Sequence, residues 1–448
     1  NLILDAKTKY FSSVFLNQFK MISILLGLAV LGYLAIVFEA PIRINKTITS
    51  ILTGSLCWVI YALMYQGNKN EVAEKLIQHF GEISGLLIFL LGAMTIVELI
   101  DIHKGFSVIT NRIRTRSVLK LLWIVGGITF FMSALLDNLA TAIIMITLLK
   151  KLMPKSETRM ILAGIVVIAA NAGGAFSPIG DITTTLLWIG GQVSALGIVK
   201  TLLLPSIMCL LIPLLLASYR MNGFTMLRVQ LSMAEVIKEE KMRGSLSVFL
   251  AGVFGLVMVP IIKSITGLPP FIGVLMALAL VSMVSIVYHR NKTQEEKEKY
   301  SVAYALSKVD VSSILYFMGI LLLVYVLEEV EILSQLSLFL QESLPSNDIM
   351  VVAIGVLSSI VDNGSLVAAT QGMFTLSEYP LDHSLWEFIA LCAGTGGSML
   401  IIGSAAGIAI MEKEKMTFLW YLKKITPLAI AGYVAGIVTY LILNLLMH

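Results

Sequence analysis

Charged residues are scarce in this 448-residue sequence. Asp, Glu, Lys and Arg make up 13% of it, against about a quarter in a typical soluble domain. Hydrophobic residues make up 57%, and the mean hydropathy is +0.90. A chain with so few charges cannot cover a water-facing surface, and many of its apolar runs approach the roughly 20 residues that a helix needs to cross a bilayer. The composition therefore predicts an all-α membrane protein that crosses the lipid bilayer many times.

Other absences narrow the function. The three cysteines and five histidines are scattered singly, so neither a metal-binding spacing nor a disulfide framework is visible. No G-x-x-x-x-G-K-[ST] phosphate-binding loop occurs, which argues against transport driven by ATP. We expect no cofactor, no enzymatic activity and no nucleic-acid partner. The sequence begins with Asn1 rather than Met, so we expect that upstream residues, such as a signal segment, are missing or have been removed by processing.

Two short patterns occur twice. Asp137-Asn138 is followed in the next apolar run by Gly173-Gly174, and Asp362-Asn363 is followed in the same way by Gly396-Gly397. The Asp-Asn pairs lie 225 residues apart and the Gly-Gly pairs 223 residues apart. Since two independent elements recur at nearly the same offset, the sequence indicates an internal duplication.

The distribution of charge predicts that the two copies are inverted. Lys and Arg favour cytoplasmic loops. Basic residues flank the first Asp-Asn stretch, whereas the loops at 328–348 and 377–387, beside the second stretch, contain none. The first stretch should therefore enter the membrane from the cytoplasm and the second from outside. Inverted repeats with discontinuous helices that meet near the midplane are the architecture of many secondary transporters.

The predicted architecture has about 11 membrane-spanning helices, two re-entrant hairpins and two broken helices. Scaffold spans occupy residues 1–82. The first repeat covers 83–219, with its hairpin around residue 137 and its broken helix around 173–181. Charged linkers at 220–243 and 290–308 and further scaffold spans fill 220–308. The second, inverted repeat covers 309–448, with its hairpin around 362 and its broken helix around 394–403.

The two acids of the duplicated pattern are the first candidates for a site. A carboxylate in the middle of a membrane helix costs roughly 2.5–3.5 kcal/mol, so it should face a cavity, a cation or a partner. A carboxylate and an amide beside backbone carbonyls at a helix break can replace the hydration of a monovalent cation. Alternatively, each Asp only caps a helix at a hairpin tip. The two Asp-Asn pairs are predicted to hold a monovalent cation. The full set of residues predicted to bind cations or protons is Asp137, Asn138, Thr141, Asp181, Thr183, Ser358, Asp362 and Asn363.

Glycines and a proline interrupt the two following apolar runs. Unpaired backbone at membrane depth is tolerated only where it is buried in protein or lines a cavity, although each break could also be a packing kink. Asp181 could cap the restarted helix, bind a cation, or do both. Ser404 stands at the matching position of the second repeat, which predicts a site weighted toward the first half. The residues predicted to expose backbone are Gly173, Gly174, Pro178, Gly180, Gly394, Gly396, Gly397 and Gly403.

A third polar group ends one of the early spans. Glu98, Asp101 and His103 lie where this span should meet the cytoplasm. They could be an ordinary interfacial helix end. They could also form a proton path or a pH sensor, because histidine is the side chain whose charge changes near neutral pH. The acidic residues at 328–331 are expected to form a solvated helix end.

With these residues laid out, the sequence resembles the NhaD-type sodium/proton antiporters of the ion transporter superfamily along nearly its whole length. The most specific segments are 90–98 (LLGAMTIVE), 136–141 (LDNLAT), 171–181 (NAGGAFSPIGD) and 361–363 (VDN). Anion symporters of that superfamily carry Ser-Asn-Thr at their hairpin tips. Asp in place of this Ser would repel a dicarboxylate and favour a lone cation. The resemblance implies a scaffold domain, a mobile transport domain with two re-entrant hairpins, and a homodimer in the bacterial inner (plasma) membrane.

The expected function is exchange of Na⁺, and of Li⁺, for H⁺ by alternating access, because a proton and a cation compete for one buried carboxylate. One alternative is a Na⁺-coupled anion or arsenite-type carrier on the same scaffold. It predicts a cationic residue at the site, and neither duplicated stretch contains Lys or Arg. The other alternative is a non-transport membrane protein, such as a protease with Asp137 and Asp362 as its acid and base. The recurring Asn and the broken helices favour ions.

Overall fold

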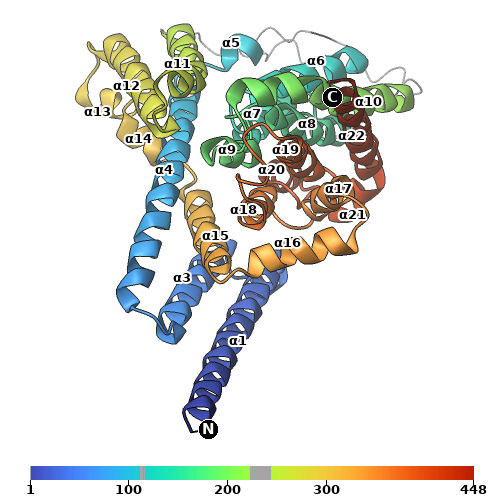
Figure 1. Cartoon of the computed structure of the whole chain (residues 1–448). Helices are drawn as coiled ribbons and strands as arrows, with labels where there is room; N and C mark the ends of the chain where they lie inside the picture. Colours follow the sequence, from blue (N-terminus) through green and yellow to red (C-terminus); the bar gives the residue numbers. More distant parts are fainter. Residues whose placement is uncertain (1, 111–114, 116, 222–243, 448) are drawn as a thin grey trace. The chain divides into compact units, whose positions relative to one another are not determined.

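A computed structural model describes residues 2–110, 115, 117–221 and 244–447, and the regular structure of these residues is entirely helical (Figure 1). Nine of the helices in these ranges are long and apolar enough to cross a membrane. The expected number was about 11. Two further helices, α19 (Ser384–Gly396) and α20 (Ala405–Glu414), are the halves of one interrupted helix, and each is too short to count. The chain is a multi-pass, all-α membrane protein.

The helices form two compact units. The first consists of Asn1–Leu87, Asp310–Pro345 and Ala368–Thr375, and the second of Ile88–Val309, Ser346–Val367 and Leu376–His448. Two helices, α4 (Lys69–Ile102) and α18 (Asn363–Met373), contribute to both units. The repeat boundaries expected from the sequence stay a prediction, and most of the expected linker 220–243 lies outside the described residues, from residue 222 onward.

Close backbone packing holds the first unit together. In this unit α3 (Lys46–Met64) packs against α15 (Val311–Glu329) through small residues. A Cβ on Gly54 would lie 2.5 Å from the carbonyl oxygen of Gly319, so only glycine permits this approach. Small residues at such contacts are typical of helix packing in membranes. The other helices of this unit are α1 (Leu2–Val37), α2 (Glu39–Ile42) and α16 (Ile332–Ser343).

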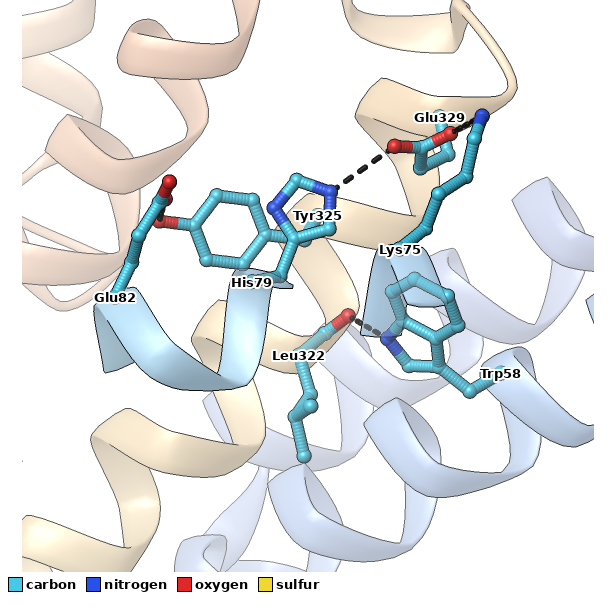
Figure 2. Close-up of polar contacts among 7 residues, drawn as sticks. All are labelled: Trp58, Lys75, His79, Glu82, Leu322, Tyr325 and Glu329. Atoms are coloured by element: carbon cyan, nitrogen blue, oxygen red, sulfur yellow. Dashed lines mark hydrogen bonds and ion pairs between the residues drawn. The ribbon is translucent and has the colours of Figure 1, made fainter. Parts of the chain in front are cut away.

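A polar cluster joins α4 to α15 within the first unit (Figure 2). Lys75 Nζ donates to Glu329 Oε2, and His79 Nε2 lies 3.0 Å from Glu329 Oε1. The His79 ring stacks on Tyr325 with 4.2 Å between centroids, and the Tyr325 hydroxyl donates to Glu82 Oε2 at 3.0 Å. This end of α15 was expected to be solvated. That expectation is wrong for Glu329, because α4 presents two basic side chains to it.

Breaking this cluster should destabilise the protein. We expect Glu329→Gln to lower the free energy of unfolding by about 1–2 kcal/mol, because charge-assisted hydrogen bonds to both Lys75 and His79 are lost. The measurement is the thermal unfolding midpoint of the purified protein in detergent. Glu331→Gln is the matched control, because Glu331 lies two residues away and is exposed. Equal midpoints for the two variants would contradict a stabilising role for the cluster.

The second unit is built around α8 (Glu157–Ala175). In its most apolar window 89% of the residues are buried, against 28% in α12 (Pro270–His289), so α8 is central and α12 peripheral. The remaining helices of this unit are α5 (Ser107–Thr110), α6 (Val118–Ser133), α7 (Asn138–Leu152), α9 (Ile182–Ile189), α10 (Ala195–Met221), α11 (Ser245–Thr266), α13 (Gln294–Glu298), α14 (Val302–Leu306), α17 (Asn347–Leu357), α21 (Phe418–Lys424) and α22 (Thr426–Met447).

Each duplicated pattern marks a place where a helix stops and restarts. Short turns separate α6 from α7 and α17 from α18. Each turn ends at the Asp of an Asp-Asn pair, and the Asn begins the next helix. Both runs that were predicted to be broken are interrupted: α8 stops at Ala175 before α9 begins at Ile182, and α19 stops at Gly396 before α20 begins at Ala405. These four interruptions create eight helix ends in the second unit, where backbone polar groups need other partners.

Candidate ion-binding site

Matching hydrogen bonds join each turn to the interrupted helix that follows it. Ser133 Oγ donates to the carbonyl of Ala170 at 2.6 Å, and Ser358 Oγ donates to that of Ala393 at 2.9 Å. The two serines are separated by 225 residues and the two alanines by 223, as in the duplicated patterns. Ser358, one of the predicted ion ligands, thus ties the end of α17 to α19.

Glycines let the backbones of these elements touch. A Cβ on Gly173 would lie 2.1 Å from the carbonyl oxygen of Phe130, and a Cβ on Gly396 would lie 2.0 Å from that of Gly355. These pairs again share the two offsets. In the first break, the carbonyl of Pro178 accepts a hydrogen bond from a threonine hydroxyl of α9. A Cβ would meet another atom at 2.4 to 2.8 Å at Gly174, Gly180 and Gly403, and at 3.0 to 3.3 Å at Gly394 and Gly397.

Asp181 lies where both turns meet. Its side chain is buried, and Asn138 Nδ2 donates to Oδ1 at 3.1 Å. Asn363 Nδ2 donates to Oδ2 at 3.2 Å, and Thr183 Oγ1 donates to the same oxygen at 3.0 Å. Asp181 occupies the N-cap position of α9. The carboxylate is therefore the point at which the two Asp-Asn turns converge.

The other two acids cap helices. Asp137 Oδ1 accepts from the backbone N–H of Ala140 at 2.8 Å, and Asp362 Oδ2 accepts from that of Ser365 at 3.4 Å. Both acids are half-buried, and the charge of Asp362 interacts with that of Asp181. Capping leaves further lone pairs on each carboxylate, so it does not by itself exclude a role in ion binding. In each turn, it is the asparagine that reaches the buried carboxylate.

Asn171 joins the two interrupted helices and was not among the predicted ligands. Its Oδ1 accepts from Asn138 Nδ2 at 3.1 Å. Its Nδ2 donates to Ser398 Oγ and to Ser404 Oγ, each at 3.1 Å. The sequence signal was a lone amide in an apolar run, two residues before a glycine pair. The matching position of the second repeat is a glycine, so the duplication does not point to Asn171.

Thr141 keeps a buried oxygen without a partner. The residue is fully buried, and within the part of the chain that the structure describes its Oγ1 makes no hydrogen bond. Thr141 follows Asn138 by three residues, so the two share a face of α7. Buried polar atoms without partners are rare in proteins, and an ion or a water is a common explanation. Thr141 Oγ1 is therefore a candidate ligand.

His103 has its own buried surroundings. Its Nδ1 lies 2.7 Å from the carbonyl oxygen of Leu99 and its Nε2 lies 3.1 Å from Ser285 Oγ, while its ring packs against His289. Burial lowers the pKa of the His103 imidazole to about 4, because the charged form loses hydration. The prediction that His103 senses pH stays untested. With this pKa the ring would titrate in acid rather than near neutrality.

Glu98 and Asp101 lie near the end of α4, shortly before His103. Glu98 is half-buried and Asp101 is exposed. The charge of Glu98 interacts with those of Asp101 and Asp137. Within the predicted proton path, Glu98 is thus the residue linked to the first Asp-Asn turn.

Known proteins share both the sequence and the fold. The citrate transporter family model matches residues 24–386. The chain is 45% identical to Sodium/proton antiporter 1 of Arabidopsis thaliana, over 95% of this chain and 72% of that protein. It is 32% identical to the Na⁺/H⁺ antiporter NhaD of Vibrio cholerae, over 92% of this chain and 90% of that protein. The chain belongs to the NhaD-type sodium/proton antiporters. The crystal structure of the Alcanivorax borkumensis YdaH transporter matches this NhaD-type chain with a TM-score of 0.56 and 10% identity, over 83% of this chain and 88% of that one.

Relatives of this NhaD-type chain come from plants as well as bacteria. They confirm the resemblance drawn from the four sequence segments, and the YdaH match supports the fold alone. They are consistent with a multi-pass membrane protein. The bacterial inner membrane therefore stays a prediction.

Proposed function

We propose that this protein exchanges Na⁺ for H⁺ across a membrane by secondary active transport. The observation that carries the proposal is the buried Asp181 carboxylate, which accepts hydrogen bonds from the asparagines of both turns. Burial disfavours a bare charge, so such a carboxylate is stable with a proton or with a cation. Since the two compete for the same oxygens, loading one releases the other. The named activity of the relatives supports the same exchange.

The residues around Asp181 can serve both occupants. An amide carries N–H donors on one atom and a carbonyl oxygen on the other. Asn138 and Asn363 now turn their donors to the carboxylate, and a half-turn of either amide would present oxygen to a cation. The hydroxyls of Thr141 and Thr183 add two more oxygens. We infer that these groups coordinate Na⁺ and that Asp137 and Asp362 supply further negative charge at the helix N-termini.

The repeated contacts support a transport cycle based on two related halves. The paired serine and glycine contacts obey the offsets of the sequence duplication. The distribution of Lys and Arg supports an inverted orientation of the halves. We propose that inverted repeats give alternating access to the Asp181 site. Transport of Li⁺, a homodimeric assembly and a location in an inner (plasma) membrane are expectations from the family resemblance.

Ion flux in reconstituted vesicles tests the proposal. We expect the purified protein in proteoliposomes to move protons in response to an imposed Na⁺ gradient, as reported by an internal pH-sensitive dye. Asp137→Asn and Asp362→Asn should each lower the rate at least about tenfold, which corresponds to 1.4 kcal/mol, because asparagine keeps the helix cap but removes the charge.

Asp310→Asn is the matched control. Asp310 caps α15 by accepting from the backbone N–H of Ser313, so this variant makes the same chemical change at a cap outside the site. It should transport at the wild-type rate. Wild-type rates in the variants of both turns would remove Asp137 and Asp362 from the mechanism. No Na⁺-dependent proton movement by the unmodified protein would refute the proposed exchange itself.

A further inference from the structure

The buried guanidinium of Arg159 contacts the ends of two other helices, far from the Asp181 site. Arg159 lies near the start of α8, and its Nε donates to Glu414 Oε2 at 3.0 Å. Its Nη1 donates to the carbonyl of Met153 at 3.0 Å. Glu414 is the last residue of α20, and Met153 is the C-cap of α7. Arg159 therefore ties the ends of α7, α8 and α20 together.

The other ends of these same helices carry site residues. α7 begins with Asn138, α8 carries Asn171, and α20 follows directly after Ser404. Hydrogen bonds of 3.1 Å link Asn138 to Asn171 and Asn171 to Ser404. At 1.5 Å of rise per residue, Arg159 and Asn171 lie roughly 18 Å apart along α8. The three helices are thus joined twice, once at the site and once at Arg159.

The ion pair at Arg159 is poorly suited to stabilise the fold by its charge alone. Arg159 and Glu414 are both buried, at 7% and 1% exposure. Taking two charges out of water offsets most of their attraction, so a buried pair contributes little net stability relative to apolar side chains. Its geometry is more restrictive than that of apolar contacts, because the planar guanidinium must meet two acceptors at once. The contact is therefore suited to fixing the axial register of α8 relative to α20.

The second repeat has a tie at the equivalent position. The offset of 223 places Asp382 opposite Arg159. The Asp382 N–H donates to the carbonyl of Gln192 at 2.9 Å, and its Oδ1 accepts from the N–H of Ser194 at 2.6 Å. These bonds join the segment before α19 to the turn after α9. A tie between interrupted helices at this position is therefore a feature of both halves.

We propose that Arg159 and Glu414 are positioning residues for the ion site. They set the axial register of α7, α8 and α20, and through it the distances from Asn138, Asn171 and Ser404 to one another beside Asp181. The inference rests on the proposed Na⁺/H⁺ exchange, since the site that they position is the proposed cation site. Weakening the Arg159–Glu414 contact lowers the affinity for Na⁺, although every proposed ligand is still present.

The Na⁺ dependence of transport tests the inference. We expect Glu414→Gln to raise the KM for Na⁺ at least about fivefold with less than about a twofold change in kcat. Arg159→Lys should act similarly, because lysine keeps the charge but cannot reach both Glu414 and Met153 as a fork. Lys424→Gln is the matched control: it breaks the exposed Lys424–Glu157 ion pair near the start of α8 and should keep the wild-type KM.

A double variant guards against simple misfolding. Arg159→Met with Glu414→Leu replaces the pair by apolar groups of similar size, which should preserve the fold and still raise the KM. A wild-type KM in this variant would overturn the inference. Amide deuterium uptake across residues 165–175 and 405–410 gives a readout that does not depend on transport. Faster uptake in the double variant is expected, and unchanged uptake would overturn the inference even if the protein proved to carry another ion.

Discussion

Asp181→Asn should abolish Na⁺-driven proton movement, with a rate at least about a hundredfold below that of the unmodified protein, or 2.7 kcal/mol. Asparagine has nearly the shape of aspartate, so the fold should survive. It can neither take up the transported proton nor neutralise a bound cation. The carboxylate also accepts hydrogen bonds from the side-chain amides of Asn138 and Asn363. An asparagine in its place would turn its own NH2 group toward one of these donors. The measurement is the initial rate of internal pH change after a Na⁺ jump in proteoliposomes.

Asp181→Glu separates charge from geometry in this experiment. It restores the charge but lengthens the side chain at a buried position, so we expect a rate between those of the Asn variant and the unmodified protein. A thermal unfolding midpoint close to that of the unmodified protein would show that the Asn variant is folded. If Asp181→Asn retained more than half of the transport rate, Asp181 could not be the shared site of Na⁺ and H⁺.

Gly173→Ala and Gly396→Ala should each prevent stable folding of the second unit. The added methyl group would lie 2.1 Å from the carbonyl oxygen of Phe130 in one variant and 2.0 Å from that of Gly355 in the other. Neither neighbour is a side chain that could rotate away. The helices would have to separate, at a cost of about 3 kcal/mol or more. We expect low yields of monodisperse protein and loss of transport.

Gly127→Ala is the control for these variants. Gly127 also lies inside a helix, α6, and a Cβ there would meet no atom within 4 Å. Alanine favours helices over glycine by about 1 kcal/mol, so this variant should be at least as stable as the parent. The measurements are size-exclusion profiles and unfolding midpoints in detergent. Normal profiles for both Gly173→Ala and Gly396→Ala would show that the close backbone contacts are not required.

The sequence predicted the interruptions of the helices because the Asp-Asn and Gly-Gly pairs that mark them are visible in the order of residues. The two offsets and the four helix interruptions depend only on which residues follow which. The sequence did not predict which acid lies at the centre, since Asp137 and Asp181 both sit beside a helix start. Their roles differ because Asp137 turns back to cap its own helix, whereas Asp181 accepts from a turn that lies 182 residues away in the sequence.

Contacts between residues far apart in the sequence explain the features that the sequence did not predict. Glu329 was expected to face water, but it meets His79 from 250 residues earlier. The Arg159–Glu414 pair joins residues 255 positions apart. Neither partner stands out in the sequence, because each looks like an ordinary charged residue at the end of an apolar run. Only the packing of the helices shows that these side chains are buried.

Ser404 has a consequence for the charge that the protein can carry. It stands where strict duplication would place a second copy of Asp181. Its hydroxyl bonds to Asn171 and carries no charge. Two identical halves would enclose a pair of carboxylates and would need two positive partners to balance them. With serine at this position, one fully buried carboxylate lies between the two turns, so one proton or one monovalent cation neutralises it, while Asp137 and Asp362 lie half-buried in the turns.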